Sequence, residues 1–300
     1  MSKSATSPPA LFDRALLRKR REKYLRAAPD FIDRFLAVEF ADRLSLINRS
    51  FETVLVTRCV PGLVGKMRVS ALMENVHVMD YAANCPDADI AGDEEWLPFA
   101  NEKLSCILSP LTLQFVNDLP GALLQARRAM APDGLFIGAM LGGSTLNELR
   151  DCLLQAEGEL GAGVSPRVAP FTDVRDGGAL LQRAGFALPV ADSDTLTVRY
   201  GSIIALMKDL RHLGWANALA GRTRGILRRD VLARVAELYA ERYSDGDGKL
   251  RATFQIVWLT GWAPHESQQK PLKPGSAKAR LADALGAAEQ KLSNSVSDED

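Results

Sequence analysis

The sequence has little cysteine and histidine for its 300 residues, and neither type occurs at a paired spacing. The four cysteines, Cys59, Cys85, Cys106 and Cys152, are far apart, and so are the three histidines. Disulfide frameworks and zinc sites use recognisable ligand spacings. The sequence therefore predicts no metal site, and reduced thiols as in a cytoplasm-like compartment.

The sequence also lacks an excess of charge of either sign and a long apolar run. Lysine plus arginine number 37, aspartate plus glutamate number 37, and the net charge is zero. Such a chain has no global field that favours nucleic acid or a membrane. No apolar run approaches the ~20 residues that span a bilayer. With 47% hydrophobic and 25% charged residues, we expect a soluble globular protein without a nucleic-acid partner or transmembrane segment, in which peripheral membrane contact stays open.

An alternation of apolar runs and a helical pattern lies between residues 92 and 143. Cys106 to Leu113 and Leu135 to Leu141 are mostly apolar, which is typical of parallel strands buried on both faces. Residues 119–130 repeat their apolar side chains at helical spacing, and residues 132–134 have turn chemistry. This pattern predicts an α/β sheet.

Acidic side chains follow two of the expected strands. The second strand, 76–80, ends in Asp80, and Asp93 and Glu94 follow a short third strand at 89–91. Ligands of open α/β sheets bind outside the carboxyl ends of the strands, where an ionised carboxylate accepts hydrogen bonds from ribose hydroxyls. Asp80 is therefore a candidate ribose ligand, with the capping of the next turn as the structural alternative. Ser109 of the fourth strand lies where that strand would reach the same ligand.

Motifs in this region resemble a known family. Residues 93–99 read Asp-x-x-x-Leu-Pro-Phe, and residues 117–120 read Asn-Asp-Leu-Pro. They resemble the class I S-adenosylmethionine (SAM) dependent methyltransferases, and the chain is most similar to the family of complex I assembly factor 5 and its bacterial relatives. The further matching segments are Leu11 to Arg14, Phe136 to Met140, Gly142-Gly143, Leu146 to Arg150, Ser165-Pro166, Pro170 to Thr172, Arg183 to Phe186, Ala252 to Ile256, Gly261-Trp262 and His265 to Gln268.

The resemblance covers about residues 11–276 and implies a fold and a domain organisation. We expect a Rossmann-like class I methyltransferase sheet with helices on both faces and a helical cap insertion. The expected methyltransferase-like domain is 11–263, with N-terminal helices at 11–50, a core sheet from 51–200 and 250–262, and the cap at 201–245. Residues 1–10 and most of 264–300 are predicted to be disordered, apart from a short helix at 277–292.

In the family, the first strand and the turn after it carry an acid and a Gly-x-Gly-x-Gly-like run that bind SAM. Here the acid position is Val56, two glycine positions are Arg58 and Val60, and only Gly62 remains. Glycine permits a positive φ and close approach of the backbone to a ligand, and a β-branched valine resists both. The resemblance implies SAM as the cofactor, held by Gly62, Asp80, Asp93, Glu94 and Ser109, and this loop departs from the pattern.

The segment from Arg14 to Arg26 carries seven basic residues against one acid, Glu22. It is interpreted in three ways: a transit peptide, a basic arm for a partner or an anionic surface, or a helix with a solvated face that covers the sheet. The four acids between residues 13 and 33 disfavour a transit peptide, and the sequence favours the solvated helix. Farther on, Ser144 is a candidate N-cap for a helix after Gly143.

The resemblance implies three functions between which the residues do not decide. The first is a SAM-dependent enzyme that modifies a protein substrate in the maturation of respiratory complex I, by methylation or arginine hydroxylation. The second is a non-catalytic assembly factor with a degenerate SAM site, and the third is a small-molecule carboxyl methyltransferase. A complex I subunit is the expected partner, with the basic segment 222–229 as its docking surface. The expected location is the bacterial cytoplasm or, alternatively, the mitochondrial matrix.

Overall fold

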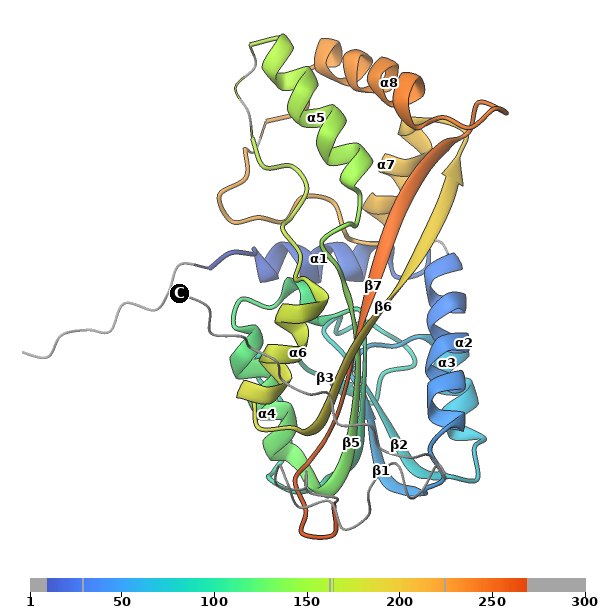
Figure 1. The fold of residues 1–300 in the computed structure, drawn as a ribbon, viewed down its shortest axis with the longest axis vertical. Coiled ribbons are helices and arrows are strands. Elements are labelled where there is room, and N and C mark those ends of the chain that lie inside the picture. The colour runs from blue at the N-terminus through green and yellow to red at the C-terminus, as the bar shows by residue number, and fades with distance from the viewer. Residues whose placement is uncertain (1–9, 29, 162, 164, 224, 269–300) are drawn as a thin grey trace, which may run out of the picture. The chain divides into compact units, whose positions relative to one another are not determined.

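The computed structural model describes residues 10–28, 30–161, 163, 165–223 and 225–268. These residues form a seven-stranded sheet in the order β3-β2-β1-β4-β5-β7-β6 with helices on both faces (Figure 1). β7 runs antiparallel to β5 and β6, and the pairs among β1 to β5 are parallel. The predicted α/β sheet is confirmed. The N-terminal lead 1–9 and the predicted helix at 277–292 lie outside the described residues.

The fourth and fifth strands differ from the predicted ones. The fifth strand begins at Met130 and not at Leu135, and the predicted turn residues 132–134 lie within it at an irregularity in its pairing with β4. Val54, Leu55 and Val56 at the centre of the first strand are fully buried, as expected for a strand covered on both faces. The fourth strand ends at Pro110 and not at Leu113, because Leu111 has a φ of 53° and the chain turns into the short 3₁₀ helix η1 (Leu113–Phe115). The strands are β1 (Phe51–Val56), β2 (Met73–Asp80), β3 (Ile90–Ala91), β4 (Leu104–Pro110), β5 (Met130–Leu141), β6 (Ala187–Tyr200) and β7 (Leu250–Trp262).

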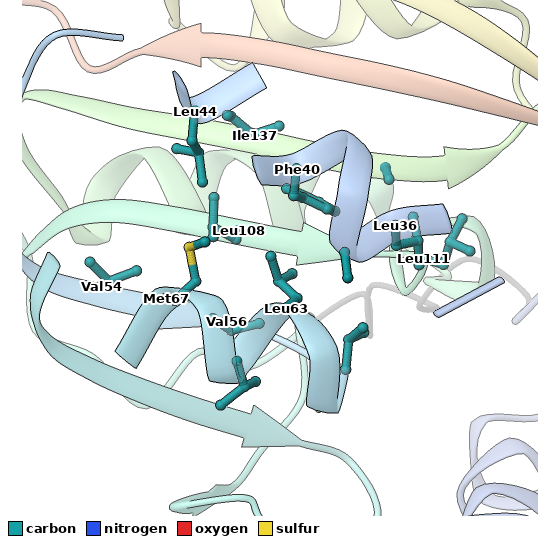
Figure 2. Packing of buried hydrophobic residues seen from close by; sticks show 14 of the residues in the cluster. Leu36, Phe40, Leu44, Val54, Val56, Leu63, Met67, Leu108, Leu111 and Ile137 are labelled. Atoms are coloured by element: carbon teal, nitrogen blue, oxygen red, sulfur yellow. The ribbon is translucent and has the colours of Figure 1, made fainter. Parts of the chain in front are cut away.

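Two pairs of helices cover the two faces of the sheet. α2 (Phe31–Ser45) and α3 (Pro61–Arg68) pack on one face, and α4 (Leu119–Ala129) and α6 (Val174–Arg183) pack on the other. Val54 and Val56 face the first pair and Leu55 faces the second, because side chains alternate along a strand. Figure 2 shows the first interface, in which α2 and α3 contribute Leu36, Phe40, Leu44, Leu63 and Met67.

The cap is built on an extension of the last two strands. β7 pairs with β5 only from Ile256 to Trp262, whereas it pairs with β6 back to Leu250. This outer part of the β6–β7 pair carries α7 (Ile203–His212) and α8 (Arg229–Tyr243), which lie within the range 201–245 predicted for the cap (Figure 1). α5 (Asn147–Glu159) also packs there, against α8.

The predicted N-cap at Ser144 is wrong. α5 begins at Asn147, and its N-cap residue is Leu146, which has a left-handed backbone with φ of 55°. The residues before it instead bind β7, because the Thr145 hydroxyl donates to the Gln255 carbonyl at 3.1 Å. Helix α5 therefore begins after the residues that bind β7.

Helix α1 (Arg14–Tyr24) lies between the carboxyl ends of the strands and the cap (Figure 1). Its N-cap is Asp13, whose side chain accepts a hydrogen bond from the Leu16 amide at 3.0 Å. Phe12 and Leu17 pack with Phe115 of η1. Within the described part of the chain, no helix combines the length and the apolar character that crossing a membrane requires.

Candidate functional site

The predicted site residues Asp80, Asp93, Glu94 and Ser109 gather where β2, β3 and β4 end. Because these strands and β1 are parallel neighbours, their carboxyl ends meet at one edge of the sheet, here called the carboxyl edge. The strand order reverses between β1 and β4, which is where open α/β sheets place their ligands. Asp80 and Asp93 both contact helix α1, so the expected proximity of the two acids holds.

Asp80 is completely buried and its carboxylate is already engaged by the protein. One oxygen, Oδ2, accepts hydrogen bonds from the Cys59 amide at 3.1 Å and from Nη2 of Arg21 at 3.0 Å. The other, Oδ1, accepts from the Ala82 amide at 2.9 Å. The Arg21 side chain is only 8% exposed. A ribose hydroxyl would therefore have to displace Arg21 to reach Asp80.

Asp93 and Glu94 together hold a second arginine of the same helix. Nη2 of Arg14 lies 2.5 Å from Oδ1 of Asp93 and 3.2 Å from Oε2 of Glu94, and Nη1 donates to the Phe115 carbonyl at 3.3 Å. Arg18 adds a looser contact to Asp93, at 3.9 Å. Three acids at the carboxyl edge are thus faced by three arginines of α1.

The surroundings of Glu94 change the proton affinity of its carboxyl group. Its side chain is 4% exposed. Burial disfavours the charged form and raises the pKa of Glu94 to about 7, an effect that Arg14 opposes and Asp93 reinforces. Glu94 therefore changes charge near neutral pH.

The loop after β1 has a conformation that accommodates Arg58 and Val60, which stand at glycine positions of the family. Arg58 is 6% exposed and forms an ion pair with Asp33 of α2, with a further hydrogen bond to the Pro110 carbonyl at 3.3 Å. Val60 has an extended backbone with φ of −122°, so the loop avoids the positive φ that glycine would permit. Arg58 thus points to α2 and does not meet a ligand at the carboxyl edge.

Three hydroxyl groups form a hydrogen-bonded cluster at the ends of β1 and β4. The hydroxyl oxygens of Thr57 and Ser109 are 3.1 Å apart, and those of Ser109 and Thr112 are 3.0 Å apart. All three residues are buried, with Ser109 1% exposed. The hydroxyl of Ser109 is therefore bonded within the protein and is not open to solvent.

Gly62, the last predicted site residue, lies in α3 and not at the ends of β2, β3 and β4, where the three acids and Ser109 gather. It lies in the first turn of α3, where an added Cβ would come within 3.3 Å of the Ala37 Cβ of α2. Its small size allows α2 and α3 to approach each other. Gly62 also lines a cavity of about 660 Å³ together with Cys59, Cys85 and Arg21.

An adenosyl cofactor does not fit the carboxyl edge in this arrangement. Bound as the sequence predicts, its ribose would have to share the carboxylate of Asp80 with Arg21 and two backbone amides, which take three of the about four acceptor positions of that group. The loop after β1 also lacks glycines that would let its backbone approach a ligand closely, because Arg58, which is directed to Asp33, and Val60 stand at two of the glycine positions. The side chains at this edge therefore bind one another in place of a ligand.

The predicted helix with a solvated face that covers the sheet is present, with Lys19 and Lys23 exposed, but the prediction did not include the buried face that carries Arg14 and Arg21. These two arginines are 17% and 8% exposed and make ion pairs with buried carboxylates. Arg14, Arg18 and Arg21 are spaced i, i+4 and i+7, which places them on one face of a helix. This i, i+4, i+7 spacing is the pattern in the sequence that indicates a charged contact face. The other basic residues of the segment make the pattern hard to recognise.

The sequence and the fold are similar to those of known proteins. A family model described as a methyltransferase domain matches residues 63–138. The chain is 38% identical over 294 residues to arginine-hydroxylase NDUFAF5, mitochondrial, of Rattus norvegicus, covering 93% of this chain and 85% of the relative. It is 35% identical over 186 residues to a malonyl-[acyl-carrier protein] O-methyltransferase of Laribacter hongkongensis, covering 62% of this chain and 60% of that protein.

Among solved structures, the YcgJ protein of Bacillus subtilis matches with a TM-score of 0.50 at 10% identity, covering 76% of this chain and 98% of that one. At this identity the likeness concerns the fold alone. The strand order, with an antiparallel β7 between β5 and β6, agrees with the Rossmann-like class I methyltransferase fold that the motifs predict. The similarity to NDUFAF5 extends over the sheet and the cap alike. The chain therefore has the class I methyltransferase fold and belongs to the NDUFAF5 family.

Proposed function

We propose that this protein is a maturation factor for respiratory complex I that works by binding a protein partner, with its cofactor edge closed by its own helix α1. This is the non-catalytic alternative among the functions that the sequence resemblance implies. The relatives named arginine-hydroxylase NDUFAF5 support the placement in this family, and the motifs that resemble complex I assembly factor 5 support the process. The partner we propose is a complex I subunit.

The observation that carries this proposal is the contact between Arg21 and Asp80. A carboxylate has about four acceptor positions, so a ribose hydroxyl has to compete with the donors that the protein itself supplies to that group. Here Asp80 is fully buried and bound to Arg21 at 3.0 Å and to two backbone amides. A cationic cofactor would have to compete with a cation that is covalently part of the chain.

Calorimetry on the full chain tests the proposal. We expect no detectable heat on titration with SAM or S-adenosylhomocysteine up to about 1 mM, while a complex I subunit is retained in a pull-down. Binding of either compound with a Kd below ~100 μM would overturn the non-catalytic proposal. Val56→Asp combined with Arg58→Gly and Val60→Gly restores the family's loop and serves as the matched variant for both measurements.

The retained acids favour a second candidate, a SAM-dependent enzyme that methylates or hydroxylates a protein substrate. Asp80, Asp93 and Glu94 still occupy the carboxyl edge next to the reversal of strand order, where a class I methyltransferase would use them. For methylation, SAM would supply the transferable methyl group when it is bound, whereas arginine hydroxylation would need an oxygen donor and oxidant in addition. The acids would hold the adenosyl part after α1 has moved, and the same calorimetry distinguishes the two functions.

We place the protein where complex I subunits are exposed to the bacterial cytoplasm, or in the mitochondrial matrix if the chain is mitochondrial. The relatives from animals are named mitochondrial. The basic segment 222–229 remains the proposed docking surface, although Arg222 is bound to Asp13 and Arg228 to Asp230. A partner therefore has Arg229 and the exposed Ile226 of this segment available for direct contact.

A further inference from the structure

Helix α1 makes two sets of contacts, and the first set holds it to the carboxyl edge. Arg14 binds Asp93 and Glu94, and Arg21 binds Asp80. These ion pairs are largely buried, and buried partners of opposite charge depend strongly on each other. The edge therefore keeps α1 in place as long as its acids have no other cation to bind.

The second set joins the start of α1 to the cap segment 216–222 through the backbone. Asp13 donates its amide to the Ala218 carbonyl at 2.8 Å, and Ala220 donates its amide to the Leu11 carbonyl at 2.8 Å. These two bonds flank a bridge between Phe12 and Leu219. Residues 11–13 and 218–220 thus form a short antiparallel pairing.

Side chains strengthen this second set. Nη1 of Arg20 donates to the carbonyls of Ala216 and Asn217, at 2.5 and 3.1 Å. Nη2 of Arg222 donates to Oδ2 of Asp13 at 3.1 Å, and its Nη1 donates to the Leu219 carbonyl at 2.9 Å. Arg20 directly precedes Arg21, so adjacent residues of one helix hold the cap segment and the carboxyl edge.

The cap segment also forms a wall of a second cavity. This cavity has a volume of about 220 Å³ and lies between the cap helices and the sheet. Trp215 to Ala218 line it together with Phe115 of η1, whose carbonyl accepts the hydrogen bond from Arg14. Two parts of the cavity wall are therefore hydrogen-bonded to α1 or to the residue before it: residues 216–218 and Phe115.

We infer that α1 is a latch that couples the cap cavity to the carboxyl edge. Displacement of Arg21 from Asp80 loosens the cap segment, and displacement of the cap segment loosens Arg21. Such coupling is reciprocal, because both displacements shift the same equilibrium between a bound and a released state of α1. This inference goes beyond the proposed function, since the latch operates in a binding factor and in an enzyme alike.

Hydrogen exchange on the full chain, without any ligand, tests the latch. Arg222→Gln removes the guanidinium contacts to Asp13 and Leu219 together with the positive charge near Arg20, and we expect it to speed the exchange of the Cys59 and Ala82 amides by about fivefold. These two amides donate to Asp80 and are far from residue 222 in the sequence. In the reverse direction, Arg21→Gln is expected to speed the exchange of amides in residues 216–222.

The matched control is Arg234→Gln, which removes ion pairs of α8 with Glu159 and Glu237 and touches neither α1 nor segment 216–222. It should leave the amides of Cys59 and Ala82 at the wild-type rate. Faster exchange of segment 216–222 alone in Arg222→Gln would overturn the latch, and so would equal effects of Arg222→Gln and Arg234→Gln. Because no cofactor is added, this outcome is independent of the calorimetry that tests the proposed function.

Discussion

Replacement of Asp80 by alanine should lower the free energy of unfolding by about 3–5 kcal/mol. Removal of the carboxylate leaves the guanidinium of Arg21, 8% exposed, without its charged partner. It also removes the acceptor of the amides of Cys59 and Ala82. Urea-induced unfolding followed by circular dichroism measures the loss as a shift of the midpoint, with the slope as a check on the unfolding mechanism.

Two further variants show whether the loss comes from the ion pair. Asp80→Ala combined with Arg21→Met replaces both charges and should be more stable than Asp80→Ala alone, because no buried cation is left unpaired. Glu237→Ala removes an exposed acid, 65% accessible, that also binds an arginine, and should stay within about 0.5 kcal/mol of the wild type. A loss below about 1 kcal/mol in Asp80→Ala would mean that the carboxylate is available for a ligand and is not part of the folded core.

The sheet and its acids were predictable because they depend on local patterns. The apolar cores of β1, β4 and β5 are short runs between turn residues, Asp80 is the last residue of β2, and Asp93 follows the end of β3 by two residues. The direction of parallel strands then places both acids at one edge without further information.

The contacts of those acids were not predictable from local patterns. A basic helix has the same composition whether its arginines face water or face carboxylates that lie far along the chain. Arg14 and Asp93 are separated by 79 residues, and Arg21 and Asp80 by 59. Only the position of α1 over the carboxyl edge shows which arginines are buried, and this position depends on its pairing with the cap segment.

The altered loop after β1 and the arginines of α1 belong to one arrangement. A residue as large as Arg58 at a glycine position would leave a charge buried without a partner, and Asp33 of α2 supplies that partner. Cys59 at the centre of the loop binds both members of the ion pair, because its amide donates to Asp80 and its carbonyl accepts from Arg21 at 3.2 Å. The loop thus supports α1 in the place where it would otherwise cradle a cofactor.

Glu94 should make the stability of the protein depend on pH between about 4.5 and about 7. In the unfolded chain its carboxyl group releases its proton near the ordinary pKa of 4.5, whereas burial raises the pKa in the folded protein to about 7. The contribution of Glu94 to the free energy of unfolding is fully present below pH 4.5 and is lost as the pH rises through about 7. The raised pKa corresponds to a contribution of about 3 kcal/mol to the free energy of unfolding. Arg14 keeps this contribution from being larger, because its positive charge favours the ionised carboxylate.

Urea unfolding of the wild type and of Glu94→Gln at about pH 5 and about pH 8 measures this effect. The wild type should lose stability relative to Glu94→Gln as the pH rises, because the glutamine has no proton to release. Glu74→Gln, at an exposed position of β2, is the control and should follow the wild type at both pH values. Parallel pH profiles for the wild type and Glu94→Gln would show that Glu94 is already ionised at low pH. Arg14 would then be held by two full negative charges, and the release of α1 from the carboxyl edge would not respond to pH near neutrality.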